Sequence, residues 1–263
     1  MGKEPKVVHK ATLVVGDFIE RKYRISRLLD EGGMGCVYHA VHEPLGRDVA
    51  VKVLKPITDE EPEKREQRHR RFLREASLSS RLNHPNTITI FDYGELDDNR
   101  GFFFVMEFLE GMSLRDLLSR NGALPVDTAL HIATQIAGSL SDAHEAGVIH
   151  RDLKPPNVML VSRGGDSHFV KVVDFGLVKD ISEDSDDDTL TAENTFVGSP
   201  LYMAPERFLS KNADSPSVDI YALGVVLYEM LAGRPPFLRD SASTLHQLIM
   251  QHIQSDPPPM RSF

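Results

Sequence analysis

The chain has 263 residues, of which 41% are hydrophobic and 26% charged, an ordinary balance for a globular protein that can bury a large core. The net charge is −9, but five acidic residues lie in one run, Glu183–Asp188, so the charge argues for or against no class of partner. One cysteine excludes an intrachain disulfide and fits a reducing compartment, and no apolar run approaches the roughly 18 residues of a membrane span.

The N-terminal stretch, residues 1–15, is basic and irregular, and we expect it to be a leader outside the fold. Tyr23–Leu29 then alternates apolar and polar residues, as a half-buried strand does. The following stretch contains Gly32, Gly33 and Gly35. Glycine lets backbone N–H groups approach a phosphate closely, so this stretch is predicted to be a hairpin over nucleotide phosphates. An ordinary hairpin turn is the alternative.

A second strand, Asp48–Leu54, has a lysine, Lys52, inside an apolar run. A polar link leads into a predicted helix, Glu63–Leu82, whose basic cluster we interpret as a solvated face. We interpret His84 as a turn and packing residue. Two strands follow, Thr87–Tyr93 and Phe102–Phe108.

The rest of the chain is mainly helical by its pattern. An apolar stripe predicts a helix over Val126–Glu145, and the nearly continuous apolar character of Asp219–Leu231 predicts a buried central helix. Shorter amphipathic helices are expected at Ser113–Arg120 and Ser241–Ile253.

The most informative stretch lies between residues 149 and 176. Two apolar runs, Val158–Val161 and Val170–Val173, are separated by a polar turn and predict a hairpin. This hairpin would bring Asp152, Asn157 and Asp174 to one edge, with Lys154 beside them. Oxygen ligands and a cation are what a magnesium-assisted phosphoryl transfer needs.

These residues stand in two ordered motifs, His150-Arg151-Asp152-Leu153-Lys154-Pro155-Pro156-Asn157 and Asp174-Phe175-Gly176. In this order and spacing the chain resembles the protein kinases. The residues after the catalytic aspartate are similar to those of serine/threonine kinases. Several short segments are similar in sequence to the eukaryotic-like kinases of bacteria. The resemblance extends over about residues 16 to 260.

The resemblance implies an α+β, bilobal protein kinase fold with a small β-rich N-lobe, one main N-lobe helix and a larger, mostly helical C-lobe. The expected boundaries are 16–106 for the N-lobe, 107–111 for the hinge and 112–263 for the C-lobe, which we expect to be incomplete at its end.

The resemblance also assigns roles to the catalytic residues. Asp152 would position the substrate hydroxyl and accept its proton, and Lys154 would balance charge on the γ-phosphate. Asn157 and Asp174 would bind magnesium. Lys52, paired with Glu75, would orient the α- and β-phosphates of ATP.

An adenine site follows from the same resemblance. Met106 would be the gatekeeper, and the backbones of Glu107 and Leu109 would hydrogen-bond the base. The apolar residues implied to line the site are Leu29, Val37, Ala50 and Met159. The cofactors are therefore ATP and Mg²⁺, with Mn²⁺ as an alternative metal.

Leu177–Met203 resembles a kinase activation segment. Thr189, Thr191 and Thr195 are its candidate phosphorylation sites, and Arg151 with Lys179 would bind the phosphate. We expect autophosphorylation there to order the segment and raise activity.

The predicted function is an ATP-dependent serine/threonine protein kinase, a cytoplasmic signalling enzyme of bacterial type. A pseudokinase that binds nucleotide or acts as a scaffold is the alternative, favoured by Asp30 in place of a loop glycine, by Ser79 and by the short C-lobe. The expected partners are ATP and protein substrates, with no nucleic acid and no membrane span in this chain. A dimer for trans-autophosphorylation and a membrane tether beyond Phe263 are left open.

Overall fold

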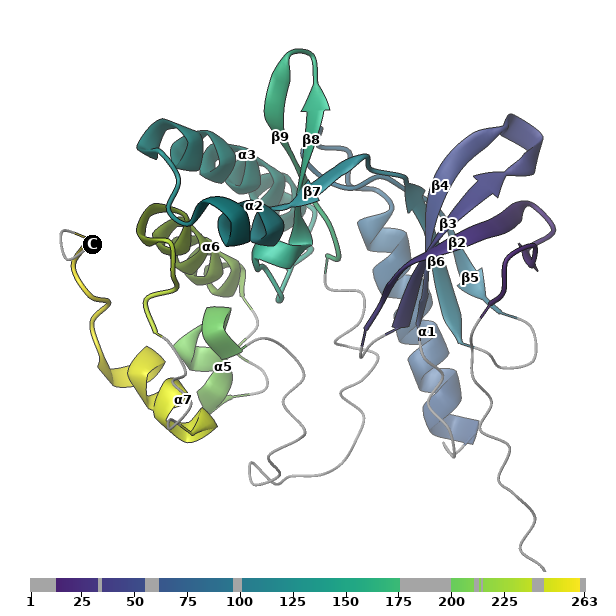
Figure 1. The fold of residues 1–263 in the computed structure, drawn as a ribbon. Coiled ribbons are helices and arrows are strands. Elements are labelled where there is room, and N and C mark those ends of the chain that lie inside the picture. The colour runs from purple at the N-terminus through teal and green to yellow at the C-terminus, as the bar shows by residue number, and fades with distance from the viewer. Residues whose placement is uncertain are drawn as a thin grey trace, which may run out of the picture. The chain divides into compact units, whose positions relative to one another are not determined.

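The fold is taken from a computed structural model, which describes residues 13–32, 35–54, 62–96, 101–175, 200–210, 213, 215–237 and 244–260 (Figure 1). The chain divides into two compact units. Unit 1 comprises Met1–Glu66 and Ile90–Phe108, and unit 2 comprises Gln67–Thr89 and Leu109–Phe263. Among the described residues, no helix has both the length and the apolar character to cross a membrane.

Unit 1 contains a six-stranded antiparallel sheet among its described residues, in the order β1-β2-β3-β4-β6-β5. Its elements are β1 (Phe18–Ile19), β2 (Tyr23–Glu31), β3 (Gly35–His42), η1 (Glu43–Leu45), β4 (Arg47–Leu54), β5 (Ile90–Glu95) and β6 (Phe102–Glu107). Alternate residues of β3 and β4, such as Tyr38 and Val51, point to one face and form a buried cluster. The other face is therefore left for the residues in between.

Helix α1 spans Pro62–Ser79, and its residues from Gln67 onward belong to unit 2. It is three residues shorter than predicted at its C-terminal end. After it, Arg81 and Leu82 continue with turn-type bonds to Leu78 and Ser79. The short segment that follows leads to β5.

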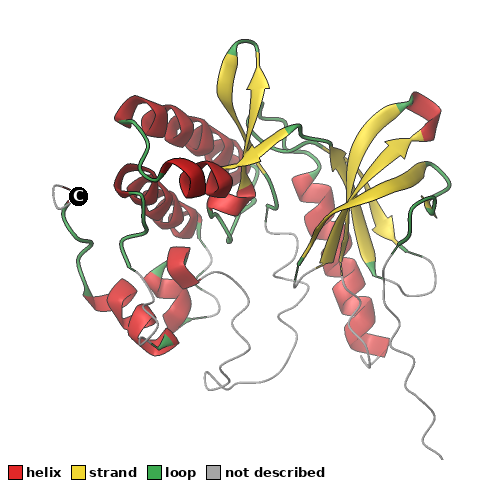
Figure 2. Cartoon of the chain, in the orientation of Figure 1, coloured by secondary structure: helices red, strands yellow, loops and turns green. Residues whose placement is uncertain are grey.

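Unit 2 is mainly helical around a three-stranded sheet, with helices in red and strands in yellow in Figure 2. Its strands are β7 (Gly111–Ser113), β8 (Val158–Arg163) and β9 (Asp166–Val172). Its helices are α2 (Leu114–Asn121), α3 (Val126–Glu145), η3 (Pro155–Asn157), η4 (Pro200–Tyr202), α5 (Pro205–Leu209), α6 (Pro216–Ala232) and α7 (Leu245–Gln254).

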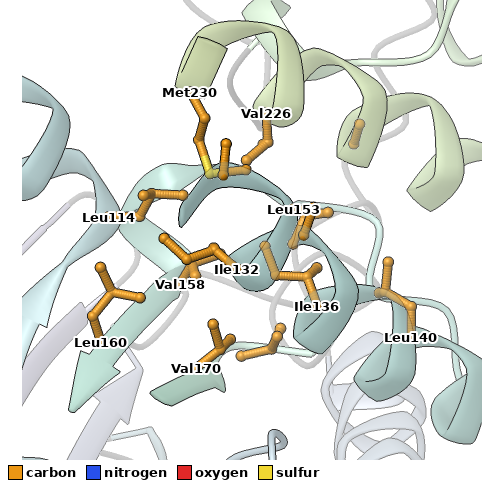
Figure 3. Close-up of a cluster of buried hydrophobic side chains, with 14 of the residues drawn as sticks. Leu114, Ile132, Ile136, Leu140, Leu153, Val158, Leu160, Val170, Val226 and Met230 are labelled. Carbon is orange, nitrogen blue, oxygen red and sulfur yellow. The ribbon is translucent and has the colours of Figure 1, made fainter. Parts of the chain in front are cut away.

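One hydrophobic core joins α2, α3, α6, β8 and β9 (Figure 3). Ile132 and Ile136 of α3 and Val226 of α6 are almost fully buried in it. Leu153, from the loop before β8, is 1% exposed and belongs to the same core. Burying a leucine side chain is worth about 1.5–3 kcal/mol, so this loop is held by packing at its centre.

The predicted α+β architecture, with a β-rich N-terminal part and a mostly helical C-terminal part, is confirmed. The predicted hairpin before Asp174 is also confirmed, as β8 and β9 pair in antiparallel register. The lobe boundaries at residues 106 and 112 stay predictions.

Candidate active site

The loop between α3 and β8 is held by one buried carboxylate. Asp219, in the first turn of α6, is 1% exposed and accepts hydrogen bonds from the backbone N–H groups of His150 and Arg151, both at 2.8 Å. The Nε2 atom of His144 lies 2.8 Å from the same carboxylate. A buried carboxylate needs such donors, and these three supply them. Asp219 therefore anchors the backbone of the loop at His150 and Arg151.

Both backbone polar groups of Arg151, its N–H and its carbonyl, are hydrogen-bonded. Its φ of 63° lies in the left-handed region, which is unfavourable by about 1–2 kcal/mol for a residue with a Cβ. Its N–H is bonded to Asp219, and its carbonyl accepts a 2.7 Å hydrogen bond from Nη1 of Arg207 in α5. Sequence reasoning missed Arg207, because nothing local to an arginine after Pro205-Glu206 indicates this distant contact.

Three of the predicted catalytic residues meet in this loop. The Nζ atom of Lys154 lies 2.8 Å from Oδ2 of Asp152, whose side chain is 17% exposed. Nδ2 of Asn157 donates to the backbone carbonyl of Asp152 at 2.9 Å and lies 3.4 Å from its Oδ2. The carboxylate is thus oriented by two side chains and remains accessible to a substrate. The amide of Asn157 turns its nitrogen toward Asp152, which leaves its oxygen for another partner.

Asp174 lies two residues beyond the end of β9. The preceding residue, Val173, donates its N–H to the carbonyl of Asn157 and accepts from Nε2 of His150, both at 3.0 Å. The His150 ring also packs on Phe175, with ring centroids 4.7 Å apart. Asp174 itself has a φ of 63°, so its backbone position depends on these surroundings. The structure therefore brings the strand end to the loop that carries Asp152 and Asn157.

In unit 1, four predicted nucleotide residues share one face of the sheet. The register pairs Val37 with Lys52 and Ala50 with Met106. Cross-strand partners point to the same side, and Ala50 and Lys52 are two residues apart on β4. This is the face opposite the buried cluster that contains Val51. A cation and three apolar side chains on one face can contact phosphate and an aromatic base.

The two described glycines of the predicted phosphate loop differ. A Cβ on Gly35 would lie 2.1 Å from the carbonyl oxygen of Val53, so the close approach of β3 to β4 requires glycine there. A Cβ on Gly32 would meet nothing within 4 Å. The fold therefore explains Gly35, whereas Gly32 is not required by packing.

The other predicted site residues are more scattered. Leu29 falls at an irregular step in the β2–β3 register, and Glu107 ends β6. Leu109 belongs to unit 2, as does Met159 on β8, which pairs with Ser113 and Lys171.

Glu75 lies on α1 in the part that clusters with unit 2, and Lys52 lies in unit 1, so their pairing stays a prediction. Gly33, the acidic run and the three candidate phosphorylation sites, Thr189, Thr191 and Thr195, lie outside the described residues.

A small pocket opens beside the catalytic loop. It is lined by Arg151, Asp152, Leu153, Tyr202, Met203, Ala204, Arg207, Val218 and Ala222. Tyr202 donates its hydroxyl to Glu229 at 2.7 Å, and burial raises the pKa of both groups. The sequence offered no signal for this pair, because its members come from distant segments. The pocket combines apolar walls with polar groups next to Asp152.

One expectation about a neighbouring residue can be compared with the structure. His84 accepts the N–H of Asn86 at Nδ1, 3.2 Å away, and its ring lies beside Gly138, which confirms a turn and packing role.

Comparison with known proteins now decides the family. The sequence profile described as Protein kinase domain matches residues 23–261. The chain belongs to the protein kinase family. The profile covers both the glycine-containing strands and the catalytic loop of this kinase domain.

Curated relatives carry the same family name. The domain is 41% identical over 247 residues to the serine/threonine-protein kinase pkn3 of Myxococcus xanthus, covering 93% of this chain and 43% of the relative. It is 41% identical to PknA of Mycobacterium tuberculosis, covering 94% of this chain and 54% of PknA, and 38% identical to PrkC of Bacillus subtilis, covering 94% and 35%. The chain thus spans about half or less of the length of these relatives.

Solved kinase structures share the fold. The PknI kinase domain of Mycobacterium tuberculosis matches with a TM-score of 0.66 at 29% identity, covering 94% of this chain and 92% of that one. A structure of Rad53 in complex with AMP-PNP matches with a TM-score of 0.68 at 29% identity, covering 88% and 53%.

Proposed function

We propose that this kinase domain is an ATP-dependent serine/threonine protein kinase that transfers the γ-phosphate of ATP to protein hydroxyls. The observation that carries the proposal is the contact of Lys154 with the accessible carboxylate of Asp152, at 2.8 Å, in a loop anchored by Asp219. The named activities of the bacterial relatives support the same reaction. They do not favour the pseudokinase alternative.

In this proposal Asp152 orients the attacking hydroxyl and accepts its proton, and Lys154 stabilises the negative charge that moves with the phosphoryl group. Phosphoryl transfer of this kind depends on positioning and electrostatics, with no covalent enzyme intermediate. Asn157 holds the backbone carbonyl of Asp152, and together with Lys154 it contacts the carboxylate, which reduces the reorganisation needed at the moment of reaction.

The donor set fits a divalent metal. The carboxylate of Asp174 and the amide oxygen of Asn157 are hard oxygen ligands, and Mg²⁺ is commonly bound by one or two such groups together with substrate phosphates. When bound, the metal neutralises charge on the phosphate oxygens. Asn157 and Asp174 would hold it, and Mn²⁺ is an alternative occupant.

The nucleotide part of the proposal rests on unit 1. Lys52 contacts the α- and β-phosphates, and Val37, Ala50 and Met106 contact the adenine from the same sheet face. The shared face of these residues supports this assignment. The backbones of Glu107 and Leu109 would bond the base, and Leu29, Gly32, Gly33, Gly35 and Met159 complete the site.

Control by autophosphorylation is part of the proposal. Arg151 precedes the catalytic aspartate and can pair with a phosphate on Thr189, Thr191 or Thr195. Mass spectrometry after incubation with magnesium and ATP should find phosphate on at least one of these threonines, and the triple alanine variant should be less active. Unmodified threonines, or full activity in the triple variant, would contradict this control.

The cellular setting follows from the reaction. In this proposal the kinase acts in the cytoplasm, and its partners are ATP and protein substrates. A dimer is the arrangement that would allow trans-autophosphorylation. Nucleic acid is not needed for this chemistry.

The activity itself is tested by incubating the protein with ATP, magnesium and a generic basic protein and mapping the phosphates by mass spectrometry. We expect phosphoserine and phosphothreonine in the wild type. Lys52→Met should abolish them, whereas Lys22→Met, in the exposed turn between β1 and β2, should not. Absence of transfer by the folded wild type, or full transfer by Lys52→Met, would refute the assignment.

A further inference from the structure

β9, the strand that leads to Asp174, is an edge strand of the three-stranded sheet in the described part of unit 2. One of its sides pairs with β8. An edge strand presents backbone N–H and C=O groups that need partners when they are buried. On the second side of β9 these groups belong to His168, Val170 and Val172.

The side-chain amide of Gln135, on α3, takes the place of a neighbouring strand at the start of this edge. Its Nε2 donates to the carbonyl of His168 at 3.1 Å, and its Oε1 accepts from the N–H of Val170 at 2.9 Å. One amide thus offers β9 a donor and an acceptor, as a strand would.

The loop after α1 continues the same edge. Nδ2 of Asn86 donates to the carbonyl of Val170 at 2.8 Å, and its backbone carbonyl accepts from the N–H of Val172 at 2.7 Å. The N–H of Ile88 donates to the carbonyl of Val172 at 2.9 Å. Every outward backbone group from the carbonyl of His168 to that of Val172 therefore has a partner.

The two side-chain amides are also bonded to each other. Nδ2 of Asn86 donates to Oε1 of Gln135 at 2.8 Å, and Asn86 is 7% exposed. Because Oε1 of Gln135 accepts two hydrogen bonds, the orientation of its amide is fixed. The loop is tied to α3 a second time, by a 2.7 Å contact between the hydroxyls of Thr87 and Ser139.

We propose that Gln135 and Asn86 are positioning residues for Asp174, because their amides fix the edge of the strand that ends beside it. Val173 is the one residue between Val172 and Asp174. A displacement of β9 is therefore passed to Asp174, whose left-handed backbone needs support from its neighbours. The inference rests on the proposed role of Asp174 as a magnesium ligand.

The test measures binding of a fluorescent ADP analogue to the intact chain, first in EDTA and then across a magnesium titration. Gln135→Met keeps the length of the side chain and removes both hydrogen bonds to β9. Loss of residues that orient metal ligands typically weakens metal binding by roughly 10–100-fold, so we expect the magnesium midpoint to rise about tenfold. Binding in EDTA should not change. Gln254→Met, at the exposed end of α7, should match the wild type in both.

A second variant and a second measurement separate positioning from general folding. Gln135→Glu keeps the acceptor for the Val170 N–H but turns a carboxylate oxygen toward the carbonyl of His168, so its midpoint should also lie above that of the wild type. Amide hydrogen exchange at Val170 should be faster in Gln135→Met. An unchanged magnesium midpoint in Gln135→Met, or in Gln135→Glu if the first variant does not fold, would overturn the inference.

Failure of the underlying function gives a different result. If magnesium does not affect ADP binding in the wild type, or if Asp174→Asn binds ADP and magnesium as the wild type does, the metal role of Asp174 is wrong and the inference falls with it. If Asp174→Asn loses the magnesium effect and Gln135→Met keeps it, only the positioning role is overturned.

Discussion

Replacing Asp219 with asparagine should destabilise the catalytic loop strongly, although the two side chains have the same shape. The Asp219 carboxylate accepts from three donors: the N–H of Arg151 at Oδ1, and the N–H of His150 with Nε2 of His144 at Oδ2. An asparagine has one oxygen. Whichever way its amide is turned, its NH₂ group faces the N–H of either His150 or Arg151.

The magnitude follows from these contacts. A hydrogen bond to a charged group contributes about 1.5–3 kcal/mol, and a buried N–H without a partner costs about 1–3 kcal/mol. Asp219→Asn turns one such hydrogen bond into a repulsive contact, and the remaining hydrogen bonds are made to a neutral acceptor. We therefore expect the free energy of unfolding to fall by about 2–4 kcal/mol. This is a large share of the roughly 5–15 kcal/mol by which a domain is stable.

Urea denaturation at neutral pH measures this loss. It is monitored by far-ultraviolet circular dichroism, because the chain has no tryptophan. Asp256→Asn is the matched control, because it makes the same chemical change at an exposed residue. It should stay within about 0.5 kcal/mol of the wild type. A loss below about 1 kcal/mol for Asp219→Asn would refute the reasoning, since the carboxylate would then not be needed to hold the two backbone groups.

Three further predictions concern other parts of the chain. Burial lowers the pKa of His252 from 6.5 to about 4, so the folded protein keeps this ring neutral while the unfolded chain takes up a proton. The free energy of unfolding should therefore fall as pH drops from 6.5 toward 4, by up to about 1.4 kcal/mol per pH unit. Urea denaturation at several pH values should find a smaller change of this free energy with pH in His252→Phe, and an equal change would contradict the prediction. Gly35→Ala should lower the free energy of unfolding by about 1–3 kcal/mol, because its Cβ would overlap the Val53 carbonyl. Calorimetry should find Gly32→Ala as stable as the wild type. Asp30 is exposed near the phosphate loop, so its charge should weaken nucleotide binding by repulsion. A charge roughly 10 Å away in water contributes about 0.4 kcal/mol, so Asp30→Asn should lower the KM for ATP about twofold. An unchanged KM would show that the charge of Asp30 does not act on the nucleotide.

The sequence predicted the elements whose signals are local. The apolar stripe placed α3 at Val126–Glu145, the span that the structure has. The hairpin was predicted with too long a turn, because β9 begins at Asp166, and Asp166 and Ser167 are residues typical of turns. The glycines of the turn, Gly164 and Gly165, both adopt positive φ and close the hairpin tightly.

The predicted starts of two helices differ from the observed ones, because residues at the helix N-terminus set where each helix begins. α7 begins at Leu245, four residues after the predicted start, because Thr244 and Gln247 form a capping box. α6 begins at Pro216, three residues before the predicted start, because proline suits the first turn of a helix. Both signals are present in the sequence and can be used.

Non-local contacts could not be predicted. β5 was expected to begin at Thr87 and begins at Ile90, because Thr87 pairs instead with Val172. In the candidate site, the motifs identified Asp152, Lys154 and Asn157, which the structure brings together. Residues such as Gln135, which act through a backbone far away in sequence, look like ordinary polar positions on a helix.

Asp152 is proposed to act in phosphoryl transfer and not to be needed for nucleotide binding. The most direct measurement is kcat for phosphorylation of a generic basic protein by Asp152→Asn, together with its Kd for magnesium and nucleotide. We expect a fall in kcat of roughly 10²–10⁴-fold, the usual contribution of a positioned acid–base group, with Kd within about twofold of the wild type. A kcat within tenfold of the wild type, in a variant that binds nucleotide normally, would show that Asp152 does not have this role.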